Sequence, residues 1–502
     1  MIDQHIGPAL SSGAPDRLTL PPAGSNRSLG AVDLILPLGV AAAVRMTLVL
    51  VFLGTTPLGD EGSYLRLGRG WSEFGAYTGN WAPGYPWLLG VLHGVVGAST
   101  DSVMRFLQVL LSVWTGAHIA YTASMFGGRR AGIAAAWVYA FYVPLAAFSA
   151  LLFSESLFLV TFVPFTFHVL RLAREGRLSA PWWRPVVAGV FLGLAALTRE
   201  STVLFVLPAS AWVAWALRGR STEKRAGRQT LQLWSKGSGP LAIAPAAILL
   251  GSFVITILPW TARNAHVYGR FVPIGVTAGS NAAISWNAPD VNFDLALLDD
   301  EDDATSVPGK LRAKIRGEEP ATWRRRHAFN RADQVRLDIA DGARFAAENP
   351  AFFLRSRVVE FVDLVSPLSF LVRQLRLVDE VGEPLESGAA RWWVSLVAVL
   401  LWPLLALLAI QGWATVWDAS PLQSFASVTI LCTSSVVLMH GLTRLRVPME
   451  PILIVLAAVA FCSMNQRPQT WRRAVASCIA VALTVAWIPS LGPVGLSLSQ
   501  LW

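Results

Sequence analysis

A series of long apolar runs constrains the fold of this chain more than any other feature. Each run is close to the roughly 20 residues that a helix needs to cross a bilayer. Hydrophobic residues make up 54% of the 502 residues and charged residues only 15%, a balance that soluble domains do not show. The sequence predicts an all-α polytopic membrane protein with about 11 transmembrane helices, in a range of about 11–13. The runs are 32–53, 103–126, 130–151, 154–172, 185–198, 200–217, 241–260, 391–410, 422–441, 447–464 and 475–491.

The basic residues predict the orientation of these helices. A formal charge of +9 could suggest a nucleic-acid ligand, but much of the Arg and Lys lies in short loops between apolar runs, the pattern that orients helices in a bilayer. Residues 83–98 are too short to span easily, so we expect them to be re-entrant or interfacial. The strongly basic loops 127–130, 171–184, 218–236 and 467–473 then share one side, which we interpret as the cytoplasm. We expect a multi-pass protein of the cell (plasma or inner) membrane with no nucleic-acid partner.

This orientation divides the chain into four predicted segments. Residues 1–30, rich in Pro, Ser and Gly, would form a disordered cytoplasmic tail. Residues 31–262 would form the N-terminal transmembrane core, including a first outer loop at 54–102. Residues 263–390 would form one modest extracytoplasmic loop domain, and residues 391–502 the C-terminal transmembrane helices. Within the loop domain, apolar spacing predicts helices at about 328–348 and 351–365.

The first outer loop carries two adjacent acids, Asp60 and Glu61, directly after the first predicted span. From Glu61 onward, Tyr64, Leu67 and Trp71 recur at helical spacing, which predicts a juxtamembrane helix lying along the outer membrane surface. Asp60 would begin this helix. It could cap the free N–H groups of the first turn, or it could act as a general base at the water–lipid boundary. The stretch by itself leaves both interpretations open.

Arginines at the predicted outer ends of several spans are a second informative group. The orientation rule disfavours basic residues at these positions. A phosphate-bearing lipid in the outer leaflet would explain them, because a guanidinium group neutralises and orients phosphate oxygens. Pairing with nearby carboxylates or lipid headgroups is the simpler alternative. The group consists of Arg199, Arg263, Arg270, Arg444 and Arg446.

The remaining outer acids and the potential metal ligands point to structural roles. Glu155 lies between two apolar runs, and Glu200 adjoins Arg199, with which we expect it to form a local ion pair. The three cysteines fall inside apolar runs without metal-ligand spacing, and the histidines in apolar runs are isolated. We predict no metal site and no cofactor, although the sequence leaves a requirement for a divalent metal open.

Short motifs in a fixed order carry a resemblance to a known group of enzymes. The chain resembles the bacterial relatives of the protein O-mannosyltransferases and of the aminoarabinose and galacturonosyl transferases that act on lipid A. These are membrane glycosyltransferases of the GT-C fold. The motifs are GDE at 59–61, APGYP at 82–86, SESL at 154–157, LTRE at 197–200, PWTARN at 259–264, YGRFVPI at 268–274 and RLRVPMEP at 444–451.

The resemblance implies a GT-C fold and a sugar donor carried on a polyprenyl phosphate. It also implies that the acid of the first outer loop, here Asp60, is catalytic, with Glu61 in support. We expect an inverting transfer on the extracytoplasmic side to an acceptor glycan, lipid or protein. The candidate contacts of the donor phosphate are Arg263, Arg444, Arg446 and Arg199. The other candidate residues of the substrate pocket are Tyr64, Tyr85, Glu155 and Arg270.

The chain also departs from these relatives. In the aminoarabinose transferases the first loop ends in a Glu-Lys-Pro-Pro type motif, whereas residues 80–83 here read NWAP, which argues against that sugar. A large soluble domain after the last span is missing too, so an envelope lipid or polysaccharide is favoured over a protein acceptor. Two other classes stay open: a polytopic lipid or glycolipid transporter or flippase, and a catalytically inactive envelope assembly protein.

Overall fold

The computed structural model describes residues 28–53, 60–74, 77, 81–176, 180–218, 239–277, 331–367, 389–416, 421–438, 443–462 and 470–487. Most of the predicted tail at 1–30, and residues 278–330 and 368–388 of the predicted loop domain, lie outside the described residues. Every regular element among the described residues is a helix. The predicted all-α class is therefore confirmed.

Nineteen helical elements make up the described fold. They are α1 (Ala31–Phe52), α2 (Asp60–Phe74), α3 (Gly84–Val96), η1 (Gly97–Ser99), α4 (Thr100–Phe141), α5 (Val143–Ala147), α6 (Glu155–Glu175), α7 (Trp183–Thr198), η2 (Glu200–Thr202), α8 (Val203–Arg218), α9 (Gly239–Tyr268), α14 (Arg331–Glu348), α15 (Pro350–Val365), α17 (Ala389–Thr415), α18 (Pro421–Ser434), η3 (Ser435–Leu438), η4 (Thr443–Arg446), α19 (Glu450–Cys462) and α20 (Thr470–Trp487).

Most of the described part of each predicted apolar run is helical, although the end of the run 130–151 beyond α5 is not. Seven helical segments among the described residues are long and apolar enough to cross a membrane, by length and composition. Three shorter apolar helices fall in α7, α19 and α20. The chain is thus a multi-pass membrane protein, and the count of about 11 spans stays a prediction.

The long α4 is two helices folded back on each other. Gly128, at its centre, has a φ of 72°, in the left-handed region that favours glycine. The segments before and after Gly128 pack against each other. The Tyr139 hydroxyl of the second donates a hydrogen bond to the carbonyl of Ser112 in the first at 2.9 Å. The predicted runs 103–126 and 130–151 therefore form a helical hairpin whose turn lies in a predicted basic loop.

Close backbone approach holds α7 against α9. Gly189 and Gly193 lie one turn apart on α7. A Cβ atom on Gly189 would collide with the carbonyl oxygen of Leu249, and one on Gly193 would lie 2.6 Å from the Cβ of Thr256. Membrane helices commonly have small residues at such contacts, which let their backbones approach closely. This matters because lipid supplies no hydrophobic force to bring the helices together.

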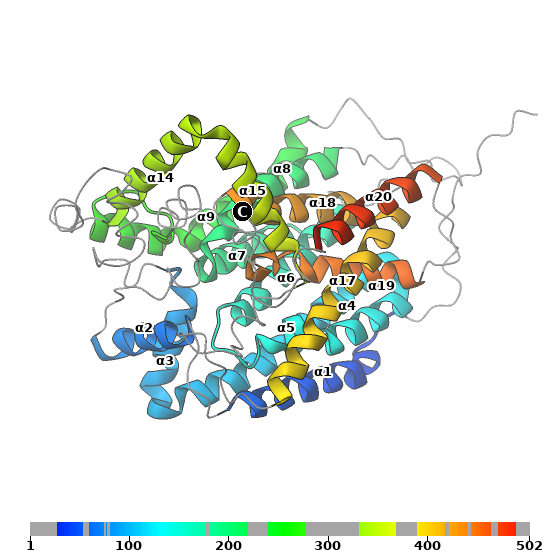
Figure 1. The fold of residues 1–502 in the computed structure, drawn as a ribbon, viewed down its shortest axis with the longest axis horizontal. Helices are drawn as coiled ribbons and strands as arrows, with labels where there is room; N and C mark the ends of the chain where they lie inside the picture. The colour runs from blue at the N-terminus through cyan, green and yellow to red at the C-terminus, as the bar shows by residue number, and fades with distance from the viewer. Residues whose placement is uncertain are drawn as a thin grey trace, which may run out of the picture.

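The helices outside the apolar runs are docked on the core. In Figure 1, α2 and α3 lie side by side at one end of the molecule, and α14 and α15 form an arch beside α9 and α20. The end of α15 is fixed by Trp402 and Trp487, whose indole nitrogens donate to the carbonyl of Val365 at 2.9 and 2.6 Å. The predicted helices at 328–348 and 351–365 thus correspond to α14 and α15.

Candidate active site

A single arginine joins the first and last parts of the chain. Arg444, in η4, donates through Nη1 to Asp60 Oδ2 and through Nε to Glu155 Oε1. Its Nη2 lies 3.4 Å from Glu155 Oε2. Arg199 donates through Nη1 to the same Glu155 Oε1. We call these four side chains the carboxylate–arginine cluster.

Helix ends present these side chains. Asp60 and Glu155 are the first residues of α2 and α6, where the positive end of the helix dipole favours a carboxylate. Arg199 directly follows α7 and caps its C-terminus, where the dipole favours a cation. Each of these three charges therefore occupies the helix end that stabilises it, and all three contact Arg444 directly or through Glu155.

Exposure distinguishes the two carboxylates. The Glu155 side chain has no exposed surface, whereas 20% of the Asp60 side chain is exposed. Burial opposes the charge on Arg444, but Glu155 and Asp60 outweigh this effect and hold the pKa of its guanidinium well above the usual value. Arg444 therefore stays a cation, and Asp60 is the carboxylate of the cluster that a substrate can reach.

Glu61, adjacent to Asp60, faces the protein interior. It is buried and accepts hydrogen bonds from Arg105 Nη2 at 3.1 Å and from the backbone N–H of Leu152 at 2.7 Å. These bonds tie α2 to α4 and to the segment that leads into Glu155. The structure thus gives Glu61 an anchoring position beneath the cluster.

Two tyrosines of the predicted pocket line the same region. Tyr64 donates to Ser154 Oγ at 3.2 Å, and its ring lies 4.9 Å from that of Tyr85. Burial raises the pKa of the Tyr64 phenol, while Arg444 acts in the opposite direction, so the hydroxyl stays a neutral donor. Tyr85 donates to Gln108 Oε1 at 2.8 Å.

The other predicted arginines do not join the cluster. Arg263 donates to the carbonyl of Tyr77 at 2.6 Å and stacks over Trp260. Arg270 pairs with Asp333 of α14 at 3.0 Å on the protein surface. Arg446 is buried, where it donates to Glu450 at 2.8 Å and to the carbonyl of Ser366 at 2.5 Å. Its guanidinium also lies 3.9 Å from the centre of the Trp402 ring.

Glu200, for which a local pair with Arg199 was expected, accepts a hydrogen bond from the Thr277 hydroxyl. Arg199 itself bonds to Glu155, which lies 44 positions earlier in the sequence. Since both contacts depend on how the helices pack, adjacency in the sequence could not predict them.

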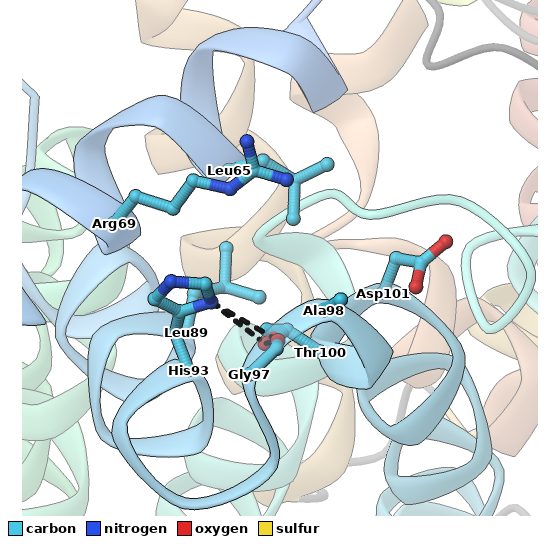
Figure 2. Close-up of a pocket in the computed structure, with 8 residues that line it drawn as sticks. All are labelled: Leu65, Arg69, Leu89, His93, Gly97, Ala98, Thr100 and Asp101. Atoms are coloured by element: carbon cyan, nitrogen blue, oxygen red, sulfur yellow. Dashed lines mark hydrogen bonds between the residues drawn. The ribbon is translucent and has the colours of Figure 1, made fainter.

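A cavity of about 160 Å³ lies between α2, α3 and the η1 turn. Figure 2 shows Arg69 extending over it from α2, opposite His93 of α3, whose Nδ1 lies 3.1 Å from the carbonyl of Gly97. Leu65 of α2 and Leu89 of α3 also line the cavity. The residues lining this cavity include none of the four cluster side chains, so it is a separate feature.

Sequence reasoning missed Arg105 and Gln108, which support the site from α4. Gln108 donates to the carbonyls of Ser149 and Leu151 at 3.0 and 2.9 Å and so holds the segment before Glu155. A signal was present, because polar residues recur at 105, 108, 112 and 115 within an apolar run, which is one face of a helix. All are buried.

The described residues contain no group of three or more His, Cys, Asp or Glu side chains that could hold a metal ion. The two cluster carboxylates have arginine partners.

Part of the chain is similar to a known protein family. The family model described as "Dolichyl-phosphate-mannose-protein mannosyltransferase" matches residues 80–230. The resemblance predicted from the motifs is thus confirmed. The matched region covers α3 to α8 and includes Tyr85, Glu155 and Arg199, while Asp60 and Arg444 lie outside it. No curated protein matches the chain.

Several solved structures are similar to the chain at low identity. The archaeal oligosaccharyltransferase AglB of Archaeoglobus fulgidus, in complex with an inhibitory peptide and a dolichol-phosphate, shares 15% identity over 90% of this chain, with a TM-score of 0.47. The arabinosyltransferase EmbB of Mycobacterium smegmatis shares 15% identity over 92% of this chain, with a TM-score of 0.31. The chain covers 54% of the first and 43% of the second, so it spans about half of their length.

Proposed function

We propose that this protein is a membrane glycosyltransferase that moves a sugar from a polyprenyl-phosphate donor to an acceptor hydroxyl at the extracytoplasmic surface of the cell membrane. The observation that carries the proposal is the carboxylate–arginine cluster. Asp60 and Arg444 lie 384 positions apart in the sequence and meet beside Glu155 and Arg199. The cluster supplies a reachable carboxylate and a permanent cation next to each other, which are the groups that this reaction needs.

The chemistry follows from these two groups. The acceptor oxygen attacks the anomeric carbon, its O–H proton passes to the Asp60 carboxylate, and the bond between that carbon and the phosphate oxygen breaks. The bonding electrons leave with the polyprenyl phosphate. Arg444 stabilises the charge that develops on the leaving oxygen. A single displacement of this kind inverts the configuration at the anomeric carbon.

Other residues in and around the cluster would position Asp60, Arg444 and the substrate. Glu155 binds both Arg444 and Arg199 and is fully buried, so it fixes the guanidinium groups from below. Tyr64, a neutral donor near the cluster, would contact the sugar or the acceptor. Glu61 would act through the backbone that it anchors and not through contact with the substrate.

The description of the matching family supports the lipid-linked donor. That family is named for the transfer of mannose from dolichyl phosphate, a polyprenyl-type phosphate carrier. The match covers Glu155, which binds Arg444 directly, and Arg199, which binds Glu155. We propose an envelope lipid or polysaccharide as the acceptor.

The test is a turnover assay with purified protein in detergent or nanodiscs. The protein is incubated with a panel of polyprenyl-phosphate sugars and with envelope lipid and glycan fractions, and released polyprenyl phosphate is measured. We expect release from a subset of donors, dependent on both the protein and the acceptor. Arg444→Gln should abolish that release, while Arg129→Gln, which removes an exposed ion pair with Asp33, should not. If the Arg444 variant matches the native rate with every active donor, the proposed site is wrong.

A further inference from the structure

Arg444 is already bound to carboxylates in the structure. Asp60 accepts from its Nη1, and Glu155 accepts from its Nε. Together with Arg199, the cluster holds two carboxylates and two guanidinium groups, so its formal charge is zero. A donor phosphate that approaches Arg444 therefore competes with the two carboxylates for the guanidinium.

The two carboxylates are not equally replaceable. Glu155 accepts hydrogen bonds from both arginines and is completely buried at the first turn of α6. Removing it would take away the carboxylate that two largely buried cations share, which is costly. Asp60 is one-fifth exposed and contacts Arg444 at Nη1. Asp60 is thus the more accessible of the two carboxylates and binds the guanidinium through one oxygen, so its bond is the one that a phosphate can displace.

We propose that the Asp60–Arg444 ion pair is a latch that the donor phosphate opens. A phosphate oxygen takes the place of Asp60 Oδ2 on Nη1 of Arg444, while Glu155 keeps the guanidinium in position. The released Asp60 carboxylate is then available to accept the acceptor proton. This inference rests on the proposed function and adds an order to it: the donor binds first, and its phosphate creates the free base.

The latch also keeps the Asp60 carboxylate inactive until the donor has bound. Without bound phosphate, Asp60 is occupied by a guanidinium and activates neither water nor an acceptor. After transfer, the product polyprenyl phosphate carries a phosphate with more negative charge than the donor diester, so it holds Arg444 until it leaves. Asp60 re-forms the ion pair when the lipid departs.

The latch makes an unusual prediction, in which loss of the base improves binding of the lipid phosphate. Undecaprenyl phosphate is titrated against the full-length protein in detergent, with binding followed by microscale thermophoresis. Asp60→Asn no longer competes as an anion for Arg444, so we expect about three- to tenfold tighter binding than in the native protein. Asp60→Ala should behave in the same way. Undecaprenol, which lacks the phosphate, should bind both proteins equally.

A double variant separates the latch from simple charge repulsion. In the Arg444→Gln background the latch is absent, so Asp60→Asn should no longer tighten binding of undecaprenyl phosphate. Asp101→Asn, which removes a carboxylate near the start of α4, should leave binding unchanged. Thermal unfolding of each variant verifies that it is folded. Unchanged or weaker binding by both folded Asp60 variants overturns the latch, and so does a gain that persists without Arg444.

This experiment is independent of turnover. If Asp60→Asn binds the lipid phosphate more tightly but keeps full transferase activity, the latch stands and the proposed base is wrong. If the same variant loses activity without a gain in binding, the proposed function stands and the latch is wrong.

Discussion

At the scale of single residues, neighbouring positions in the sequence have very different environments. Asp60 and Glu61 are adjacent at the start of α2, where successive side chains point about 100° apart. One of them reaches Arg444 at the exposed edge of the cluster, and the other is buried against Arg105. The two adjacent acids of this chain therefore have different partners and different exposure.

Replacing Glu61 should affect stability first. Glu61→Gln leaves Arg105 as a buried cation without its carboxylate partner, which costs about 3–5 kcal/mol. We expect a clear fall in the thermal unfolding temperature of the detergent-solubilised protein. Glu73→Gln, at a half-exposed position on the same helix, is the matched control and should change little. An unchanged unfolding temperature together with lost turnover would instead assign Glu61 a direct role in the reaction.

At the scale of elements, η4 joins the cluster to the rest of the core. Arg444 and Arg446 lie two positions apart in this short turn. Arg444 points to the cluster, whereas Arg446 reaches Ser366 at the end of α15 and Glu450 at the start of α19. Arg446 thus anchors the element that carries Arg444.

Arg446→Gln should loosen η4 and weaken phosphate binding without removing a phosphate ligand. It leaves Glu450 buried without its cation, so we expect a loss of about 3 kcal/mol or more in stability and several-fold weaker binding of undecaprenyl phosphate. Arg270→Gln is the control, because its pair with Asp333 is half exposed and such pairs contribute less than about 1 kcal/mol. Unchanged stability in the Arg446 variant would return this residue to the list of phosphate contacts.

The sequence predicted most of the helix positions but few of the contacts between charged side chains. Helix positions followed from apolar runs, and Asp60, Glu155, Arg199 and Arg444 stood out because charges at the ends of membrane helices need a reason. Their partners did not follow, since the contact between Arg444 and Asp60 depends on the packing of α2, α6 and η4. Nor could spacing decide which of Arg444 and Arg446 faces the cluster, because that depends on the direction of a four-residue turn.

At the scale of the whole molecule, α6 relates the cluster to the opposite surface. It has 21 residues and is therefore about 30 Å long, close to the thickness of the hydrocarbon core. Glu155 at its start belongs to the cluster, and Arg174 near its end is exposed. The two ends of α6 therefore correspond to opposite faces of the bilayer.

Labelling of single cysteines tests the proposed orientation. In a background without Cys432, Cys462 and Cys478, we expect Arg66→Cys, exposed on α2, to react with a membrane-impermeant maleimide in sealed right-side-out vesicles. Arg174→Cys should react only after the vesicles are permeabilised. The reverse pattern would place the cluster on the cytoplasmic side and exclude an extracytoplasmic transferase.

The central claim is that Asp60 removes the acceptor proton during transfer, and the rate of polyprenyl phosphate release by Asp60→Asn tests it most directly. Asparagine keeps the shape of the side chain but cannot accept the proton. General base catalysis contributes about a hundredfold or more, so the account predicts a loss of at least that size. The variant should stay folded and bind the lipid phosphate at least as tightly as the native protein, and Asp101→Asn should keep the native rate. A folded Asp60→Asn variant that releases polyprenyl phosphate at the native rate would contradict the account.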